Sequence, residues 1–168
     1  MKKRIAFFMI LWISLLLVSC SGKPSMEELL AYQRPGTVCS LRITDGEVFY
    51  ADLYIGERET VLIFTDEKRE GISYRMKPDG SISLFFEDTE IPLAMSELVK
   101  CKLWFSAFSV SAGENIWKIK KDTFGGISLF VCKDGFFTLH IDAASGLPLR
   151  IEAGSMTVDV LSCTVTEN

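Results

Sequence analysis

The chain has 168 residues, of which 48% are hydrophobic, and its formal net charge is −4. This length fits one domain of ordinary size with a substantial core. An acidic chain with no stripe of lysine or arginine is a poor binder of nucleic acid, so that class of partner is excluded.

The first twenty residues have the pattern of an export signal. Residues 2–4 are basic and precede an apolar run, Ile5 to Val18, that is too short to span a bilayer comfortably. The run ends in Leu17-Val18-Ser19-Cys20, which resembles the lipobox of bacterial lipoproteins. The resemblance implies that residues 1–19 are a signal peptide and that Cys20 becomes a diacylated N-terminus. An ordinary signal peptide with a chance cysteine is the alternative.

A lipid on Cys20 determines where the protein is expected to reside. Two acyl chains hold a protein on a membrane stably, whereas one anchors it only marginally. We therefore expect residues 20–24 to tether a single β-rich domain, residues 25–168, to the membrane on the extracytoplasmic side of a bacterial cell envelope. Removal of residues 1–19 takes away three basic side chains, so the formal charge of the mature protein is −7.

Four further cysteines lie in the predicted domain: Cys39, Cys101, Cys132 and Cys163. Their wide spacing, without a C-x-x-C pair, predicts neither a zinc site nor a redox motif, and we expect no metal and no cofactor. An extracytoplasmic location permits disulfides, but the pairing cannot be chosen from sequence. Free cysteine is among the most buried residue types, so buried core thiols are favoured over any disulfide.

A short helix is predicted directly after the tether. Ser25 and Glu28 have the S-x-x-E spacing of a capping box, in which each side chain accepts a hydrogen bond from a free N–H of the first turn. The helix is expected to run from Met26 to about Gln33. Arg34-Pro35-Gly36 ends it, because proline disfavours a helical residue before it.

From residue 38 onward the sequence alternates with a period of two and carries turn signals about every ten residues, which predicts an antiparallel meander. Asp45-Gly46 and Asp134-Gly135 are hairpin dipeptides. Pro148 indicates that its strand lies at a sheet edge or contains a bulge. A change in which residues face the core, near Val160, indicates a bulge in the last strand. The expected strands are Val38–Thr44, Glu47–Ile55, Thr60–Thr65, Ile72–Met76, Ile82–Phe86, Asn115–Lys121, Ile127–Lys133, Phe137–Ile141, Leu147–Ile151 and Met156–Val165.

One helix interrupts this meander. Ile91-Pro92 begins a run with helical spacing, since proline suits the first turn of a helix. The ordinary interpretation is a helix that packs on the core side of the sheet, and the alternative is a lid over a hydrophobic cavity. Its apolar stripe consists of Ala94, Leu98, Cys101, Phe105 and Phe108, with Met95, Val99 and Trp104 beside it.

The residues offer little chemistry for catalysis. His140 is the one histidine, so a catalytic triad would have to use it, with Asp142 as the residue that could orient it. No G-x-S-x-G, phosphate loop, H-E-x-x-H or EF-hand spacing is present in the sequence. We therefore expect a protein that is not an enzyme, and a hydrolase that uses His140 is the remaining alternative.

The whole outline resembles small bacterial lipoproteins of the lipoprotein-carrier superfamily (LolA/LolB-like). The resemblance rests on the lipobox, the capped helix, the interrupted meander, and the D-x-x-S/T-G-x-P segment from Asp142 to Pro148. The pattern along the chain predicts an α+β, mostly β fold of about nine or ten antiparallel strands with one or two covering helices, and the resemblance implies that this sheet is curled into a half-open barrel. In that group the sheet shelters acyl chains.

Two functions of different classes follow. The first is a membrane-anchored protein whose apolar concavity binds a lipid or another hydrophobic ligand. The second is an envelope protein-interaction or sensor module without a small-molecule ligand, because an acidic surface can also bind a membrane partner. The residues expected to line a hydrophobic site are Phe85, Leu98, Trp104, Phe105, Phe108 and Trp117.

Overall fold

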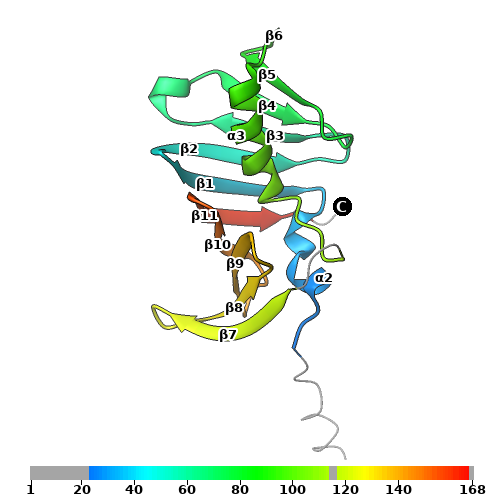
Figure 1. The fold of residues 1–168 in the computed structure, drawn as a ribbon, viewed down its shortest axis with the longest axis vertical. Coiled ribbons are helices and arrows are strands. Elements are labelled where there is room, and N and C mark those ends of the chain that lie inside the picture. The colour runs from blue at the N-terminus through cyan, green and yellow to red at the C-terminus, as the bar shows by residue number, and fades with distance from the viewer. Residues whose placement is uncertain (1–22, 114–116, 167–168) are drawn as a thin grey trace, which may run out of the picture.

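One antiparallel sheet of eleven strands organises the computed structural model, which describes residues 23–113 and 117–166 (Figure 1). The order across the sheet is β6-β5-β4-β3-β2-β1-β11-β10-β9-β8-β7, so the first strand lies beside the last. The sheet is curled and does not close, because β6 and β7 are both free edges. The predicted signal peptide and Cys20 lie outside the described residues.

The strands form two meanders that meet at β1 and β11. The N-terminal meander contains β1 (Thr37–Asp45), β2 (Glu47–Ile55), β3 (Thr60–Phe64), β4 (Ile72–Met76), β5 (Ile82–Phe86) and β6 (Thr89–Ile91). The C-terminal meander contains β7 (Lys118–Phe124), β8 (Ile127–Lys133), β9 (Phe137–Asp142), β10 (Pro148–Ala153) and β11 (Met156–Val165). Ten of these strands match predicted ones, which confirms a mostly β fold.

The strand β6 was not predicted, and it raises the count to eleven. It has three residues, all exposed, so it carries no alternation of apolar and polar side chains. Glu87 begins the turn that leads into it, with φ of +53°, a conformation for which glycine or asparagine is the usual sequence signal. The predicted helix consequently begins later than Pro92.

Both predicted bulges are present. Ser40 pairs with Ser162 and Leu41 with Val160, which leaves Leu161 as the extra residue of β11. Pro148 pairs with Ile141 and Arg150 with His140, which leaves Leu149 as the extra residue of β10. A bulge shifts the parity of a strand, so β11 keeps Val158 and Cys163 on the same face although they are five residues apart.

The helices lie against one face of the sheet. The segment α2 (Met26–Leu29) begins at the capping box, where Ser25 accepts from the Glu28 N–H at 3.2 Å and Glu28 accepts from the Ser25 N–H at 2.8 Å. It passes into the 3₁₀ turn η1 (Ala31–Gln33), so the helix is shorter than expected. No helix in residues 23–113 or 117–166 has the length and apolarity required to cross a bilayer.

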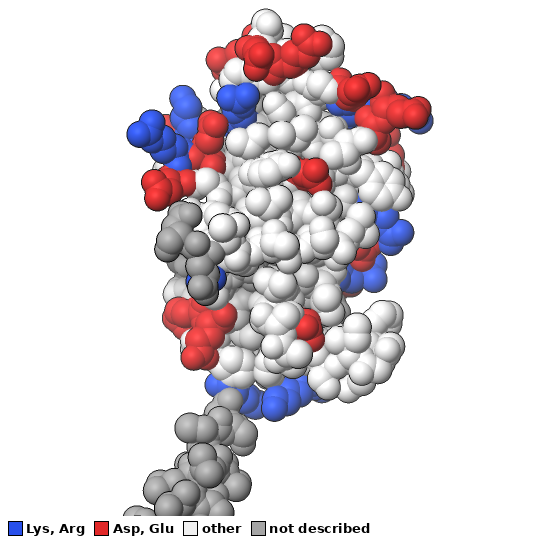
Figure 2. All heavy atoms as spheres, turned by 180° about the vertical axis from the view of Figure 1, so that it is seen from behind, with Lys and Arg blue, Asp and Glu red and all other residues white. Residues whose placement is uncertain are grey.

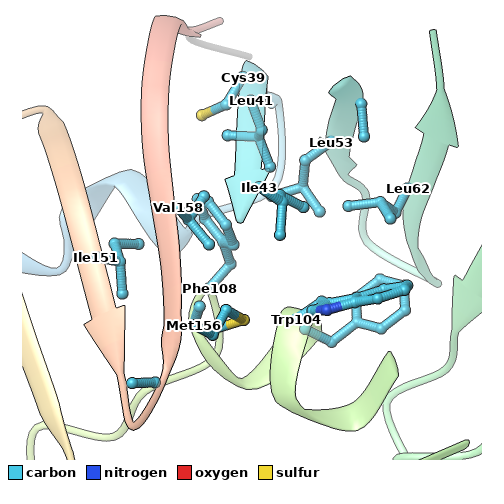
Figure 3. Close-up of a cluster of buried hydrophobic side chains, with 14 of the residues drawn as sticks. Cys39, Leu41, Ile43, Leu53, Leu62, Trp104, Phe108, Ile151, Met156 and Val158 are labelled. Carbon is cyan, nitrogen blue, oxygen red and sulfur yellow. The ribbon is translucent and has the colours of Figure 1, made fainter. Parts of the chain in front are cut away.

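The long helix α3 (Met95–Ser106) crosses the N-terminal meander on this covered, concave face (Figure 1). Phe105 and Cys101 are fully buried beneath it, and Phe108 follows within the core at 4% exposure. Figure 3 shows Phe108 next to Val158 and Met156 of β11, and Trp104 on the side of the core where Leu53 and Leu62 lie. A single continuous core therefore joins both meanders, α2 and α3.

The structure corrects the interpretation of the cysteines. Cys39 of β1 and Cys163 of β11 are directly opposite each other and form a disulfide. Cys101 and Cys132 are buried free thiols, as expected for core cysteines. Cys39 lies on the core face of β1 with Leu41 and Ile43, but its disulfide partner depends on which strand lies beside β1, and a single sequence does not reveal that.

Counting thiols tests this pairing. Alkylation of the denatured, unreduced chain should label Cys101 and Cys132 and leave Cys39 and Cys163 unlabelled, and prior reduction should add labels at both. Peptide mass spectrometry assigns each site. Because the disulfide closes a loop of 124 residues, replacing both Cys39 and Cys163 with alanine should lower the free energy of unfolding by about 2–5 kcal/mol. Labelling of all four cysteines before reduction would contradict the pairing.

Candidate functional site

A cleft of about 220 Å³ opens between the first half of α3 and the concave face of the N-terminal meander. Strands β2, β3 and β4 supply its floor, and the 3₁₀ turn η2 (Glu67–Arg69) closes one side. The lining residues are Asp45, Glu47, Phe49, Phe64, Arg69, Ile72, Tyr74, Glu97, Lys100 and Trp104. The cleft thus combines an apolar, aromatic interior with charged groups at its rim.

Four aromatic rings form the interior. The Trp104 ring centroid lies 5.0 Å from that of Phe49, 6.0 Å from Phe64 and 5.7 Å from Tyr74. Phe49 and Phe64 are themselves 5.3 Å apart in an edge-on arrangement. Tilted and edge-on ring pairs of this kind add stabilisation beyond the area they bury. Trp104 is therefore the side chain through which α3 is packed onto three strands at once.

The rim is held by ion pairs and one indole hydrogen bond. Arg69 contacts Glu47 at 2.7 Å and Asp66 at 3.1 Å, and its guanidinium stacks over the Phe49 ring at 5.1 Å. The Trp104 Nε1–H donates to Asp45 Oδ2 at 3.3 Å. Sequence reasoning did not find these rim residues, because Asp45 belongs to a turn dipeptide and Arg69 to a charged loop.

The hydroxyl of Tyr74 on β4 and the thiol of Cys101 on α3 lie between the helix and the sheet. Burial raises the pKa of the Tyr74 hydroxyl, and it raises the pKa of the Cys101 thiol to about 11. Both groups therefore carry their protons at neutral pH, and neither is an ionised nucleophile.

The structure brings together some of the predicted lining residues and separates others. Trp104, Phe105 and Phe108 are buried on the concave face, and Leu98 of the same helix is half-buried. Trp117 precedes β7, at the other end of the sheet order, where its indole donates to the Ser111 carbonyl at 3.2 Å.

Phe85 lies on the opposite face of the sheet from α3. Its neighbour Leu84 is buried on the concave side, while Phe85 itself stacks with the Arg75 guanidinium, 4.3 Å from its ring centroid. Grouping Phe85 with the helix residues was thus wrong, because three consecutive apolar residues do not reveal which of them faces the core.

The size of the cleft determines what it can accept. Pockets for small molecules usually measure about 300–1,000 Å³, so a cleft of about 220 Å³ is small. The rest of the concave face beneath α3 is filled by the helix's own side chains, with Trp104 at 8% exposure and Phe105 fully buried. A long apolar ligand therefore requires α3 to move away from the sheet.

His140 lies outside this site, on the convex face of β9. Its Nε2 is 3.7 Å from Glu152 Oε1 and has no hydrogen-bond partner among the described residues. Burial lowers the pKa of His140, and the Glu152 carboxylate offsets this only in part. Asp142 does not orient the imidazole, because its carboxylate accepts from the Ser145 hydroxyl at 2.6 Å and closes the following turn.

Comparison with known proteins gives information on the fold and none on function. No family model matches the chain, and no curated protein matches it. Among solved structures, it is similar to an uncharacterized conserved protein from Thermus thermophilus, with a TM-score of 0.55 and 12% identity over 85% of this chain and 86% of that chain. The likeness shows that another protein adopts this arrangement of strands and helices.

Replacing Trp104 tests its role in holding α3. Trp104→Ala should lower the free energy of unfolding by about 3–5 kcal/mol, since it empties the centre of the aromatic cluster. Trp104→Phe keeps a ring and should cost less. Urea unfolding followed by circular dichroism measures both, with Tyr54→Ala as the control, because Tyr54 is 40% exposed on the other face. Equal effects of Trp104→Ala and Tyr54→Ala would contradict this role.

The lowered pKa of His140 predicts a pH dependence of stability. The unfolded chain binds the proton more readily than the folded one, so stability is full above about pH 6.5 and falls as the pH drops toward the folded pKa. His140→Gln should remove this part of the decline between about pH 7.5 and about pH 5. Unfolding free energies of both proteins at several pH values provide the measurement, and identical pH profiles would refute the assignment.

Proposed function

We propose that this chain is a lipid-anchored protein of the bacterial cell envelope that binds a hydrophobic ligand, such as an acyl chain, between α3 and the concave sheet. In this proposal the curled sheet acts as a half-open barrel, α3 is a lid, and Cys20 carries the anchor. The single observation that carries it is the aromatic cleft, which lies directly under α3 and opens to solvent.

The way α3 is attached supports movement of the helix. Its N-cap, Ala94, offers no side-chain hydrogen bond, so the first turn lacks a capping side chain. Its outward surface is also apolar in part, because Met95 is 75% exposed and Val99 67% exposed. A helix with apolar residues on both sides loses less when it leaves the sheet for a lipid environment than a strictly amphipathic helix does.

Photo-crosslinking from lipid tests the proposal. The full chain is reconstituted into vesicles that contain a phospholipid with a diazirine at the end of its acyl chain, and crosslinked residues are located by mass spectrometry. We expect crosslinks at Tyr74, Trp104 and their neighbours in the cleft. Ile72→Phe, which fills the cleft, should reduce them at least threefold.

The matched control is Ile63→Phe. Ile63 is 39% exposed on the convex face of β3, so the same substitution there leaves the cleft unchanged. Crosslinks confined to convex-face residues, or crosslinks unaffected by Ile72→Phe, would refute binding under α3.

A protein-interaction module is the second candidate, and the convex face favours it. Figure 2 shows a broad uncharged strip along this face, with charged side chains mainly at its margins. Tyr50, Tyr54 and Ile63 are 44%, 40% and 39% exposed there. Exposed apolar patches of this kind often mark sites of protein interaction. Absence of cleft crosslinks, together with a bound partner that Tyr54→Lys releases, would favour this candidate.

A further inference from the structure

The free edge strand β7 carries the densest group of basic residues in the described chain. Lys118, Lys120 and Lys121 are all exposed on it. Lys133 of β8 lies directly opposite Lys118 in the ladder. Like charges in opposite positions of a sheet are destabilising, so this arrangement has a cost that an external anion would remove.

Among the described residues, no ion pair neutralises these lysines. No ammonium group of the four lies within 4.0 Å of a carboxylate in the described part of the chain, whose ion pairs are formed by arginines and His140. The acids nearby close turns: Asp122 accepts from the Thr123 N–H at 2.8 Å, and Asp134 from the Phe137 N–H at 2.6 Å. Within the described residues the lysines therefore have no carboxylate partner, and Lys121 Nζ lies 5.7 Å from the centroid of the Phe130 ring.

Charge is separated along the long axis of the molecule. The opposite free edge, around β6, carries the exposed acids Glu87, Asp88 and Glu90. Figure 2 shows acidic side chains gathered at the β6 end and basic side chains at the β7 end. Lysines on an edge strand also discourage pairing between sheet edges, and the seven-residue β7 needs this protection more than the three-residue β6 does. Edge protection does not account for the exposed apolar side chains beside the lysines.

The β7 end also bears exposed apolar side chains and lies near the start of the described chain. Phe124 is 77% exposed and Ile127 49% exposed at the β7–β8 turn, and Phe136 is 57% exposed beyond Lys133. In the view of Figure 1 the described chain begins at the same end of the molecule as β7. Three residues separate Cys20 from Pro24, and the four Cα–Cα steps between them span at most about 14 Å at full extension.

We propose that the β7–β8 edge is a membrane-contacting surface that binds anionic phospholipid headgroups and orients the domain with β6 pointing away from the bilayer. The inference rests on the proposed lipid anchor at Cys20. Lysines supply attraction to anionic lipid, and exposed aromatic side chains enter the boundary between headgroups and acyl chains. The acidic β6 end is repelled by the same surface, so both ends favour one orientation.

Lysine acetylation tests this orientation. The mature protein, which begins at Cys20, is mixed with vesicles of phosphatidylcholine alone, or with one third phosphatidylglycerol, and acetylation rates are measured at each lysine by mass spectrometry. Lys118, Lys120 and Lys121 should react at least threefold more slowly with the anionic vesicles, whereas Lys68 and Lys77 should not change. The protection should disappear at about 1 M salt, where the Debye length is about 3 Å.

Charge reversal supplies a matched pair of variants. The triple substitution Lys118→Glu, Lys120→Glu and Lys121→Glu should abolish protection of Lys133 by anionic vesicles. Lys68→Glu, Lys77→Glu and Lys102→Glu change the net charge equally and should preserve it. Circular dichroism verifies that both variants fold.

The outcomes separate this inference from the anchor on which it rests. Equal acetylation rates at Lys118, Lys120 and Lys121 in both kinds of vesicle would overturn the membrane-contacting edge. An intact mass without acyl groups on Cys20, in protein isolated from bacterial membranes, would overturn the anchor instead. The two measurements are independent, because acetylation in the presence of added vesicles can be followed whether or not Cys20 carries acyl groups.

Discussion

The pairing of the first strand with the last is the constraint on which the sheet depends. β1 and β11 are neighbours in the middle of the order, and each continues into its own meander. Without this ladder the chain would form two separate sheets, of six and five strands, each with an uncovered apolar face. The disulfide between Cys39 and Cys163 lies in this ladder. The same pairing makes β6 and β7 the edges and leaves α3 to connect them.

Local patterns predicted most of this sheet. β2, β4 and β11 have the expected bounds, because strict alternation and turn residues mark their ends. The parity change in β11 predicted a bulge near Val160, and the extra residue is Leu161. The strand β6 and the Cys39–Cys163 disulfide were not predicted, since the first is too short to alternate and the second depends on a contact across 124 residues.

Only the residues of the site that lie on α3 could be predicted, because helical periodicity indicates which side chains of a helix are buried. Spacing along α3 placed Phe105 and Phe108 on the core side correctly, and Trp104 beside them. Met95 and Val99 share that apolar run yet are exposed, because the helix is apolar around more of its circumference than the sheet can cover. Asp45, Arg69 and Glu97 reach one cleft from a turn, a loop and a helix. The sequence around each of these residues does not indicate that the three lie close together in the fold.

The length of the connection through α3 bears on what keeps the sheet curled. Eleven strands laid flat, about 4.8 Å apart, would place the two edges about 48 Å from each other. The twelve residues of α3 span about 18 Å. The fourteen other residues between Ile91 and Lys118 could add about 45 Å at full extension. The covalent link is thus long enough for a flat sheet. Apolar contact with α3 favours the curvature, and an entering acyl chain could replace that contact without straining the backbone.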